Sequence, residues 1–220
     1  MSALPSHMLG VHAAAGRPLP AARPGLDYEL TVPQDARQAL ARGWLWLGLL
    51  ALVGSGLFSI LLVLSRTPYV NQWLPAANFF QVSLVLHVDL SVLVWFVAQG
   101  GMLWSIHGTR RGTHWGWLAL AVAAVGTLAM ALAPFLNRGD PVMANYIPVL
   151  DSPLFLGGLV VFGAGTALLV LRSLLAAPRL GLEYDGRGAL DFGLSSAAIA
   201  TAVGLLAFAW SYAVLPTALH

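Results

Sequence analysis

Charged residues are scarce in this 220-residue chain, and cysteine is absent. Charged side chains make up 9% of the sequence and hydrophobic ones 58%, whereas a soluble domain carries about a quarter charged residues. So few charges could not cover a surface that faces water. The lack of cysteine excludes disulfides, thiolate nucleophiles, iron–sulfur clusters and cysteine-ligated zinc. Any metal or cofactor must therefore be held by histidine, carboxylate, methionine or backbone.

Lysine is also absent, so all 11 basic residues are arginines. They are dispersed along the chain and the net charge is only +2, which predicts no nucleic-acid partner. The sequence is instead rich in 23 glycines and 8 tryptophans. Both residues are favoured in proteins that span a bilayer, for close helix contact and for interfacial anchoring.

Residues 1–40 differ from the remainder of the chain. Several prolines and scattered charges predict a mobile cytoplasmic tail, which ends in a short amphipathic helix from Pro33 towards Arg42. The first apolar run starts only near Gly43 and exceeds the length of a signal-peptide core, so no cleaved signal peptide is expected.

Residues 41–220 contain five apolar stretches, each long enough to cross the roughly 20-residue hydrocarbon core. Because lipid offers no partners for backbone groups, uninterrupted runs of this length predict helices. The predicted fold class is all-α, a polytopic membrane helix bundle of about five transmembrane helices. The expected spans are 43–64, 78–104, 115–136, 153–175 and 192–215.

Arginine placement predicts the orientation of these helices. Most arginines fall in the tail, in the second-to-third loop and in the fourth-to-fifth region, whereas only Arg66 and Arg138 fall on the other side. The N-terminus is therefore expected inside, and the C-terminus outside, the membrane. Tyr69, Trp73 and Tyr146 would then lie at the outer interface.

Two ionisable residues interrupt the second span, in the stretch LVLHVDLSVLVWF. Such residues are costly in a membrane and indicate function. His87 lies about nine residues from the outer end of its helix, or roughly 13 Å in. Neutral imidazole is a good ligand for heme iron or copper, whereas a structural alternative is a histidine hydrogen-bonded across helices. No second axial ligand is evident, because the other histidines fall at the surfaces or in the tail.

Asp89 is two positions further on and points to a different helix face, so we expect no direct pair with His87. It is a candidate for a proton relay, or for binding an arginine or a heme propionate. The structural alternative is an aspartate hydrogen-bonded between helices.

Other polar or small residues favour structural roles. Asp191 is expected to cap the start of the fifth helix, Asp151 to precede the start of the fourth, and Gln99 to bond between helices. The glycines of GLFS, AVAAVG and LGGLVVFGAG are predicted to be close-packing positions. For the connection around Asp140 we favour a plain solvated loop over a cap that folds back over the bundle.

The stretch NFFQVSLVLHVDLSVLVWFVAQGGMLWS, with the later NYIPVLDSPLFLGGLVVFGAG, resembles the catalytic subunit (subunit I) of heme–copper oxidases. The similarity is closest to a divergent bacterial branch of cytochrome c oxidase subunit I, and it covers roughly residues 40–220. In that family the second helix enters from the periplasmic side and carries one axial histidine of the low-spin heme in its outer half. His87 matches that position in helix order, direction and depth.

The resemblance implies a low-spin heme whose iron His87 ligates, and electron transfer towards oxygen reduction with proton coupling. It also implies other oxidase subunits and cytochrome c or a similar donor as partners. The sequence departs from the family in two respects. Val88 replaces the usual small residue after the histidine, and the copper and high-spin-heme ligands of the family have no counterpart here.

No catalytic residue is therefore predicted in this chain, which would not be active alone. Copper and a second heme are expected only if a C-terminal part supplies their ligands. Two alternatives stay open: a non-catalytic membrane assembly or scaffold subunit, and a small proton or solute transport protein that uses Asp89.

Overall fold

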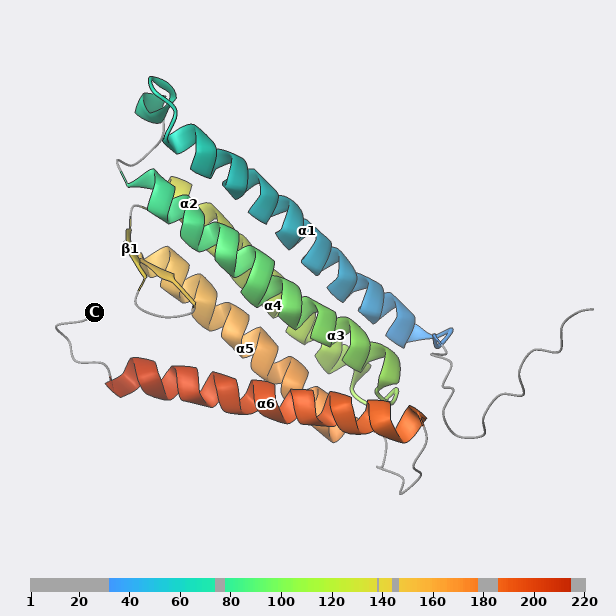
Figure 1. The fold of residues 1–220 in the computed structure, drawn as a ribbon. Coiled ribbons are helices and arrows are strands. Elements are labelled where there is room, and N and C mark those ends of the chain that lie inside the picture. Colours follow the sequence, from blue (N-terminus) through green and yellow to red (C-terminus); the bar gives the residue numbers. More distant parts are fainter. Residues whose placement is uncertain (1–31, 74–77, 138, 144–146, 178–185, 215–220) are drawn as a thin grey trace, which may run out of the picture.

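The computed structural model describes residues 32–73, 78–137, 139–143, 147–177 and 186–214. The predicted tail up to residue 31, Arg138, Tyr146 and the chain after residue 214 lie outside the described residues. Five helical spans long and apolar enough to cross a membrane run up and down along the molecule (Figure 1). The predicted class, an all-α polytopic membrane bundle of five spans, is confirmed.

The first span, α1 (Ala36–Ser65), starts earlier than the predicted Gly43. Asp35 caps it, because its side chain accepts a 2.9 Å hydrogen bond from the Arg37 backbone nitrogen. Residues 36–40 therefore belong to a single long helix rather than to a tail or to a separate amphipathic helix. A short 3-10 turn, η1 (Val70–Trp73), follows α1.

The second span is one rod made of three helical pieces: α2 (Phe79–Val88), the π-helical η2 (Asp89–Val94) and α3 (Trp95–His107). It packs along α1. Trp44 of α1 is fully buried, and a Cβ added at Gly101 of α3 would lie 2.5 Å from its ring. Glycine at this position therefore lets the indole seat between the two helices.

The third and fourth spans, α4 (Thr113–Leu136) and α5 (Pro153–Leu175), form the closest helix pair. A Cβ on Gly126 would lie 2.3 Å from the Phe162 nitrogen, and one on Gly165 would lie 2.6 Å from the Ala123 nitrogen. The close-packing prediction is therefore right for glycines of AVAAVG and LGGLVVFGAG. It is wrong for Gly56, Gly157 and Gly163, where an added Cβ would meet nothing within 4 Å. Gly157 and Gly163 line a cavity between α5 and α6 rather than a close helix contact.

A β-hairpin joins these two helices, so the connection is not a plain solvated loop. Strands β1 (Asp140–Val142) and β2 (Val149–Asp151) pair antiparallel, with Asp140 opposite Asp151. Leu150 is fully buried, and Asn78 donates a 3.3 Å hydrogen bond to Asp140, which is itself exposed as expected. The hairpin thus closes the end of the bundle where α2 begins. Pro153 occupies the first turn of α5 directly after it, as the Asp151 position predicted.

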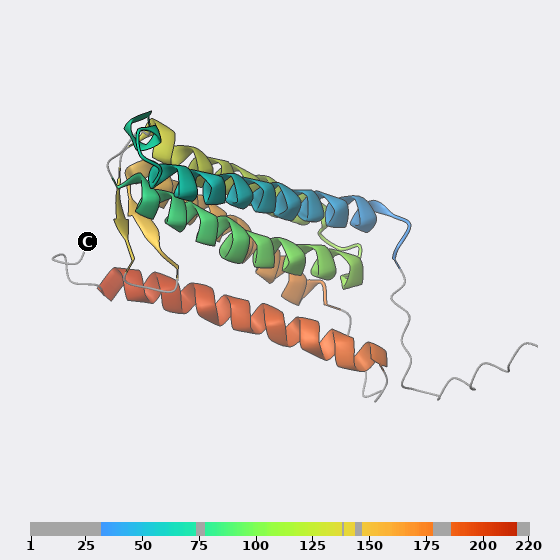
Figure 2. The ribbon, with the colours of Figure 1, turned by 45° about the horizontal axis from the view of Figure 1, so that its top comes forward.

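The fifth span, α6 (Gly186–Val214), lies along one side of the other helices (Figure 2). Only 6% of its most apolar stretch is buried, against 28% or more in each other span. Asp191 lies inside α6 and does not cap it, so that prediction is wrong. The helix starts at Gly186, before the apolar run begins. In this polar first part Arg187 and Asp191 form an i,i+4 ion pair at 3.9 Å, which favours the helix.

Candidate functional site

The two helices α1 and α2 meet at His87. Its Nδ1 atom lies 3.0 Å from the backbone oxygen of Ser55 and 2.9 Å from the Ser55 hydroxyl. The hydroxyl in turn donates a 2.9 Å bond to the His87 carbonyl oxygen. Ser55 is buried, and a Cβ added to the neighbouring Gly54 would lie 3.2 Å from Leu90, so small residues allow this close approach.

This contact orients the imidazole. A carbonyl oxygen only accepts, so the bond to Ser55 places a proton on Nδ1. In the neutral ring Nε2 then carries the lone pair, and Nε2 has no hydrogen-bond partner among the residues that the structure describes. Histidines that bind metals commonly donate the other ring N–H to a carbonyl in this way. His87 therefore fits the demands on an axial ligand of a heme iron.

The ring of His87 lies at the edge of the buried face of its helix. Leu86 and Asp89 are almost fully buried, whereas His87 and Val88 are partly exposed and Val92 is 50% exposed. Nε2 can thus be reached from the side of the second span that the five helices leave uncovered. A planar group or a further helix could approach it there.

A π-helical segment starts two residues after His87. It disturbs the usual hydrogen-bond ladder, and such segments are frequent at functional sites. The hydroxyl of Ser91 donates a 2.6 Å bond to the His87 carbonyl, which also accepts from Ser55. Two side-chain donors therefore hold the backbone at this position.

Asp89 points into the protein. It is 1% exposed, and neither carboxylate oxygen has a hydrogen-bond partner among the described residues. As predicted, it makes no hydrogen bond or ion pair with His87, because two helical residues turn the chain by roughly 200°. Buried carboxyl groups are normally paired, so Asp89 remains a functional candidate. Within the described residues, no arginine forms an ion pair with Asp89.

The remaining histidines of the described chain lie away from His87. His107 ends α3, and His114 is exposed in the first turn of α4. No group of three or more metal-binding side chains converges among the described residues. His87 is thus the one described histidine within the apolar length of a span, and a second axial ligand is not found in this part of the chain.

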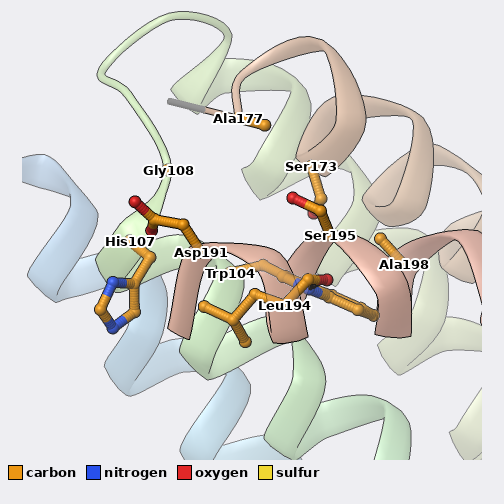
Figure 3. A pocket seen from close by; sticks show the side chains of 9 residues that line it. All are labelled: Trp104, His107, Gly108, Ser173, Ala177, Asp191, Leu194, Ser195 and Ala198. Carbon is orange, nitrogen blue, oxygen red and sulfur yellow. Dashed lines mark hydrogen bonds between the residues drawn. The ribbon is translucent and has the colours of Figure 1, made fainter. Parts of the chain in front are cut away.

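A small cavity of about 20 Å³ lies where α3, α5 and α6 meet, large enough for one water molecule. Figure 3 shows Asp191 and Ser195 of α6 on its wall, opposite Ser173 of α5, with His107 beside Asp191. The Trp104 indole crosses the cavity and donates a 2.9 Å bond to the Leu194 carbonyl. This polar cluster is where α6 is attached to the bundle.

Asp35 joins α1 to the loop between α3 and α4. Its carboxylate accepts from Arg37 at 3.0 Å and from Arg110 at 2.8 Å. The Arg37 hydrogen bonds, followed by that of Arg110, hold the pKa of Asp35 well below its usual range. Arg37 also donates a 2.7 Å bond to the Gly108 carbonyl. Charged side chains therefore connect the start of α1 to the α3–α4 loop at this end of the bundle.

Several features were missed in the sequence. Ser55 is the partner of His87, and the only signal for it was a lone serine between two glycines in an apolar helix. Arg172 falls in the predicted fourth span and lies within α5, but its burial, with 4% of it exposed, was not predicted. Gln99, predicted to bond between helices, has no partner for its Nε2 atom among the described residues.

Fold and site together define a multi-pass helical membrane protein. No known protein family matches the chain, and neither does any solved structure. It is 28% identical, over 198 residues, to the uncharacterized protein RP382 of Rickettsia prowazekii (strain Madrid E), covering 79% of this chain and 38% of that protein. It is also 29% identical, over 131 residues, to an uncharacterized protein of Aquifex aeolicus (strain VF5), covering 60% and 33% respectively. The chain thus spans about a third of the length of these curated relatives.

Proposed function

We propose that this chain is the N-terminal, low-spin-heme-binding part of the catalytic subunit of a respiratory terminal oxidase. The observation that supports this most directly is the imidazole of His87. Its Nδ1 proton is held by the Ser55 carbonyl at 3.0 Å, which leaves Nε2 free at an uncovered helix face. The heme would supply one-electron chemistry, on the way from cytochrome c or a similar donor to an oxygen-reducing centre.

The protein residues have defined tasks in this proposal. His87 would ligate the iron, and Ser55 would orient the ring. The second axial ligand, the copper and the second heme would belong to polypeptide outside these five helices. The relatives match this chain over 38% and 33% of their own length, which leaves room for such a part.

The arginines suggest the orientation of the bundle. The end that carries Asp35 and the α3–α4 loop holds most of the described arginines, whereas Arg66 lies at the hairpin end. By the positive-inside rule we place the first end in the cytoplasm of a bacterium and the hairpin outside the inner membrane. His87 then lies in the outer half of the bilayer.

The test is the reduced-minus-oxidised optical spectrum of the complex purified from its own membranes. We expect His87→Ala to remove the low-spin heme signal, and added imidazole to restore part of it in His87→Gly. His107→Ala, at the end of the same rod, is the matched control and should keep the signal. A heme signal that survives in His87→Ala would overturn the proposal.

Asp89 supports a second candidate, a small proton transport protein, because its carboxyl is buried without a hydrogen-bond partner among the described residues. For that function we expect no heme in the purified complex, and proton flux in liposomes that Asp89→Asn abolishes. A scaffold subunit would show neither the heme signal nor the flux.

A further inference from the structure

A groove of about 440 Å³ opens at the end of the bundle that carries the α3–α4 loop. It runs between the start of α4 and the last turns of α5. Leucines and one tryptophan make up its walls, and arginines stand at its end: Trp115, Leu168, Leu171, Leu175, Arg111 and Arg172.

Arg172 places a positive charge behind the wall of the groove. Its Nε donates a 3.1 Å bond to the Gly112 carbonyl, whereas Nη1 and Nη2 are buried and have no hydrogen-bond partner among the described residues. The side chain fits there because Gly116 has no Cβ, which would lie 3.1 Å from Nε. A buried guanidinium without a counter-charge is costly, so this site favours an anion nearby.

The carboxylates that the structure describes at this end, Asp35 and Asp191, do not supply that anion. Asp35 pairs with Arg37 and Arg110, and Asp191 lies 3.9 Å from Arg187. Arg111 is exposed beside the groove, and neither it nor Arg172 has an ion pair within the described residues. In the part of the chain that the structure describes, two arginines at the groove therefore lack an acidic partner.

The rest of the groove is suited to a hydrocarbon chain. Trp115 and Leu171 are about half exposed, and Leu175 is 77% exposed. Tryptophan and arginine at the end of a span are typical of the level of the lipid headgroups. The groove thus presents apolar walls towards the bilayer and positive charge at the headgroup level.

We propose that this groove binds one anionic phospholipid. The phosphate lies at Arg111 within the field of Arg172, and an acyl chain lies between Trp115 and the leucines of α5. Basic pockets between transmembrane helices are known to select such headgroups. The bound lipid holds the start of α4 against the end of α5. This site is independent of any heme at His87.

The test uses the full chain, delipidated in detergent and titrated with phosphatidylglycerol while thermal unfolding is followed. We expect phosphatidylglycerol to raise the unfolding temperature, and phosphatidylcholine to do so much less. Arg111→Gln should weaken binding about fivefold, the factor for one arginine at a membrane surface. Arg42→Gln removes the same charge from an exposed position of α1 outside the groove, and should bind like the wild type.

A second pair of variants tests the apolar wall. Leu171→Trp fills the groove and should reduce binding, whereas Leu174→Trp, on the same helix but outside the groove, should not. Equal stabilisation by both lipids, or unchanged binding in Arg111→Gln, would overturn the proposal. Full competition by inorganic phosphate would overturn it too, because it would indicate a free-anion site.

Discussion

Nδ1 of His87 and the backbone oxygen of Ser55 lie 3.0 Å apart, so α1 determines the tautomer of a histidine in α2. Because the acceptor is a backbone atom, no single substitution at Ser55 removes it. The imidazole is therefore oriented by the packing of two helices rather than by one side chain.

Ser55→Ala tests the contribution of the Ser55 hydroxyl separately from that of its backbone carbonyl. It removes the hydroxyl bonds to His87 but keeps the backbone acceptor, so we expect about 1 kcal/mol of lost stability. The His87 tautomer should persist, which nitrogen-15 NMR of the imidazole can measure. Ser65→Ala, whose hydroxyl bonds only its own helix, is the control and should cost less. A tautomer change in Ser55→Ala would contradict the assignment.

Gly126→Ala tests the contact between α4 and α5. The new methyl would meet the Phe162 backbone, so the helices must separate, at a cost of about 1–3 kcal/mol. Thermal unfolding in detergent measures it. Gly163→Ala, in open space on α5, should be neutral or slightly stabilising, because alanine favours helix. Equal effects of the two variants would show that the close approach does not matter for stability.

Trp104→Phe tests the attachment of α6. It keeps the ring in place but removes the indole bond to the Leu194 carbonyl, a loss of about 1 kcal/mol. Because α6 is otherwise thinly packed, we expect faster hydrogen exchange in its first turns and little change in α4 and α5. Trp46→Phe, at an exposed tryptophan of α1 with no indole hydrogen bond in the described part of the chain, is the matched control. Uniformly faster exchange along the whole chain would argue against a local attachment.

The lowered pKa of Asp35 predicts that the stability of the fold decreases at acid pH. Its pKa is depressed in the folded chain by Arg37 and Arg110, so the carboxylate stabilises the fold above the ordinary aspartate pKa of about 3.9. That contribution is lost as the pH falls below this value towards the folded pKa. Unfolding temperatures measured between about pH 3 and pH 7 should fall at the acid end, and less so in Asp35→Asn. An unchanged acid slope in Asp35→Asn would contradict this role.

The five spans could be predicted from the sequence because a helix that crosses the hydrocarbon core must be apolar over roughly 20 residues. The apolar run Pro153–Leu175 even gives its bounds correctly, since Pro153 and the polar residues before it mark the start. The predicted starts of the first and fifth helices were wrong, because these helices begin earlier, at Ala36 and Gly186. A helix can extend beyond its apolar run where a cap such as Asp35 bonds a free backbone N–H, or where an ion pair such as Arg187–Asp191 stabilises the polar turns. Hydropathy does not detect either feature.

The sequence by itself determined that His87 lies inside a membrane-spanning helix, and that Asp89 faces another side, because both follow from helix length and period. Only the tertiary structure decided that Ser55 holds the His87 ring, that Asp89 lacks a partner, and that Arg172 is buried behind an apolar groove. These facts depend on which faces of separate helices meet. That choice follows from packing between residues far apart in the chain, such as Gly126 against Phe162, and no local pattern encodes it.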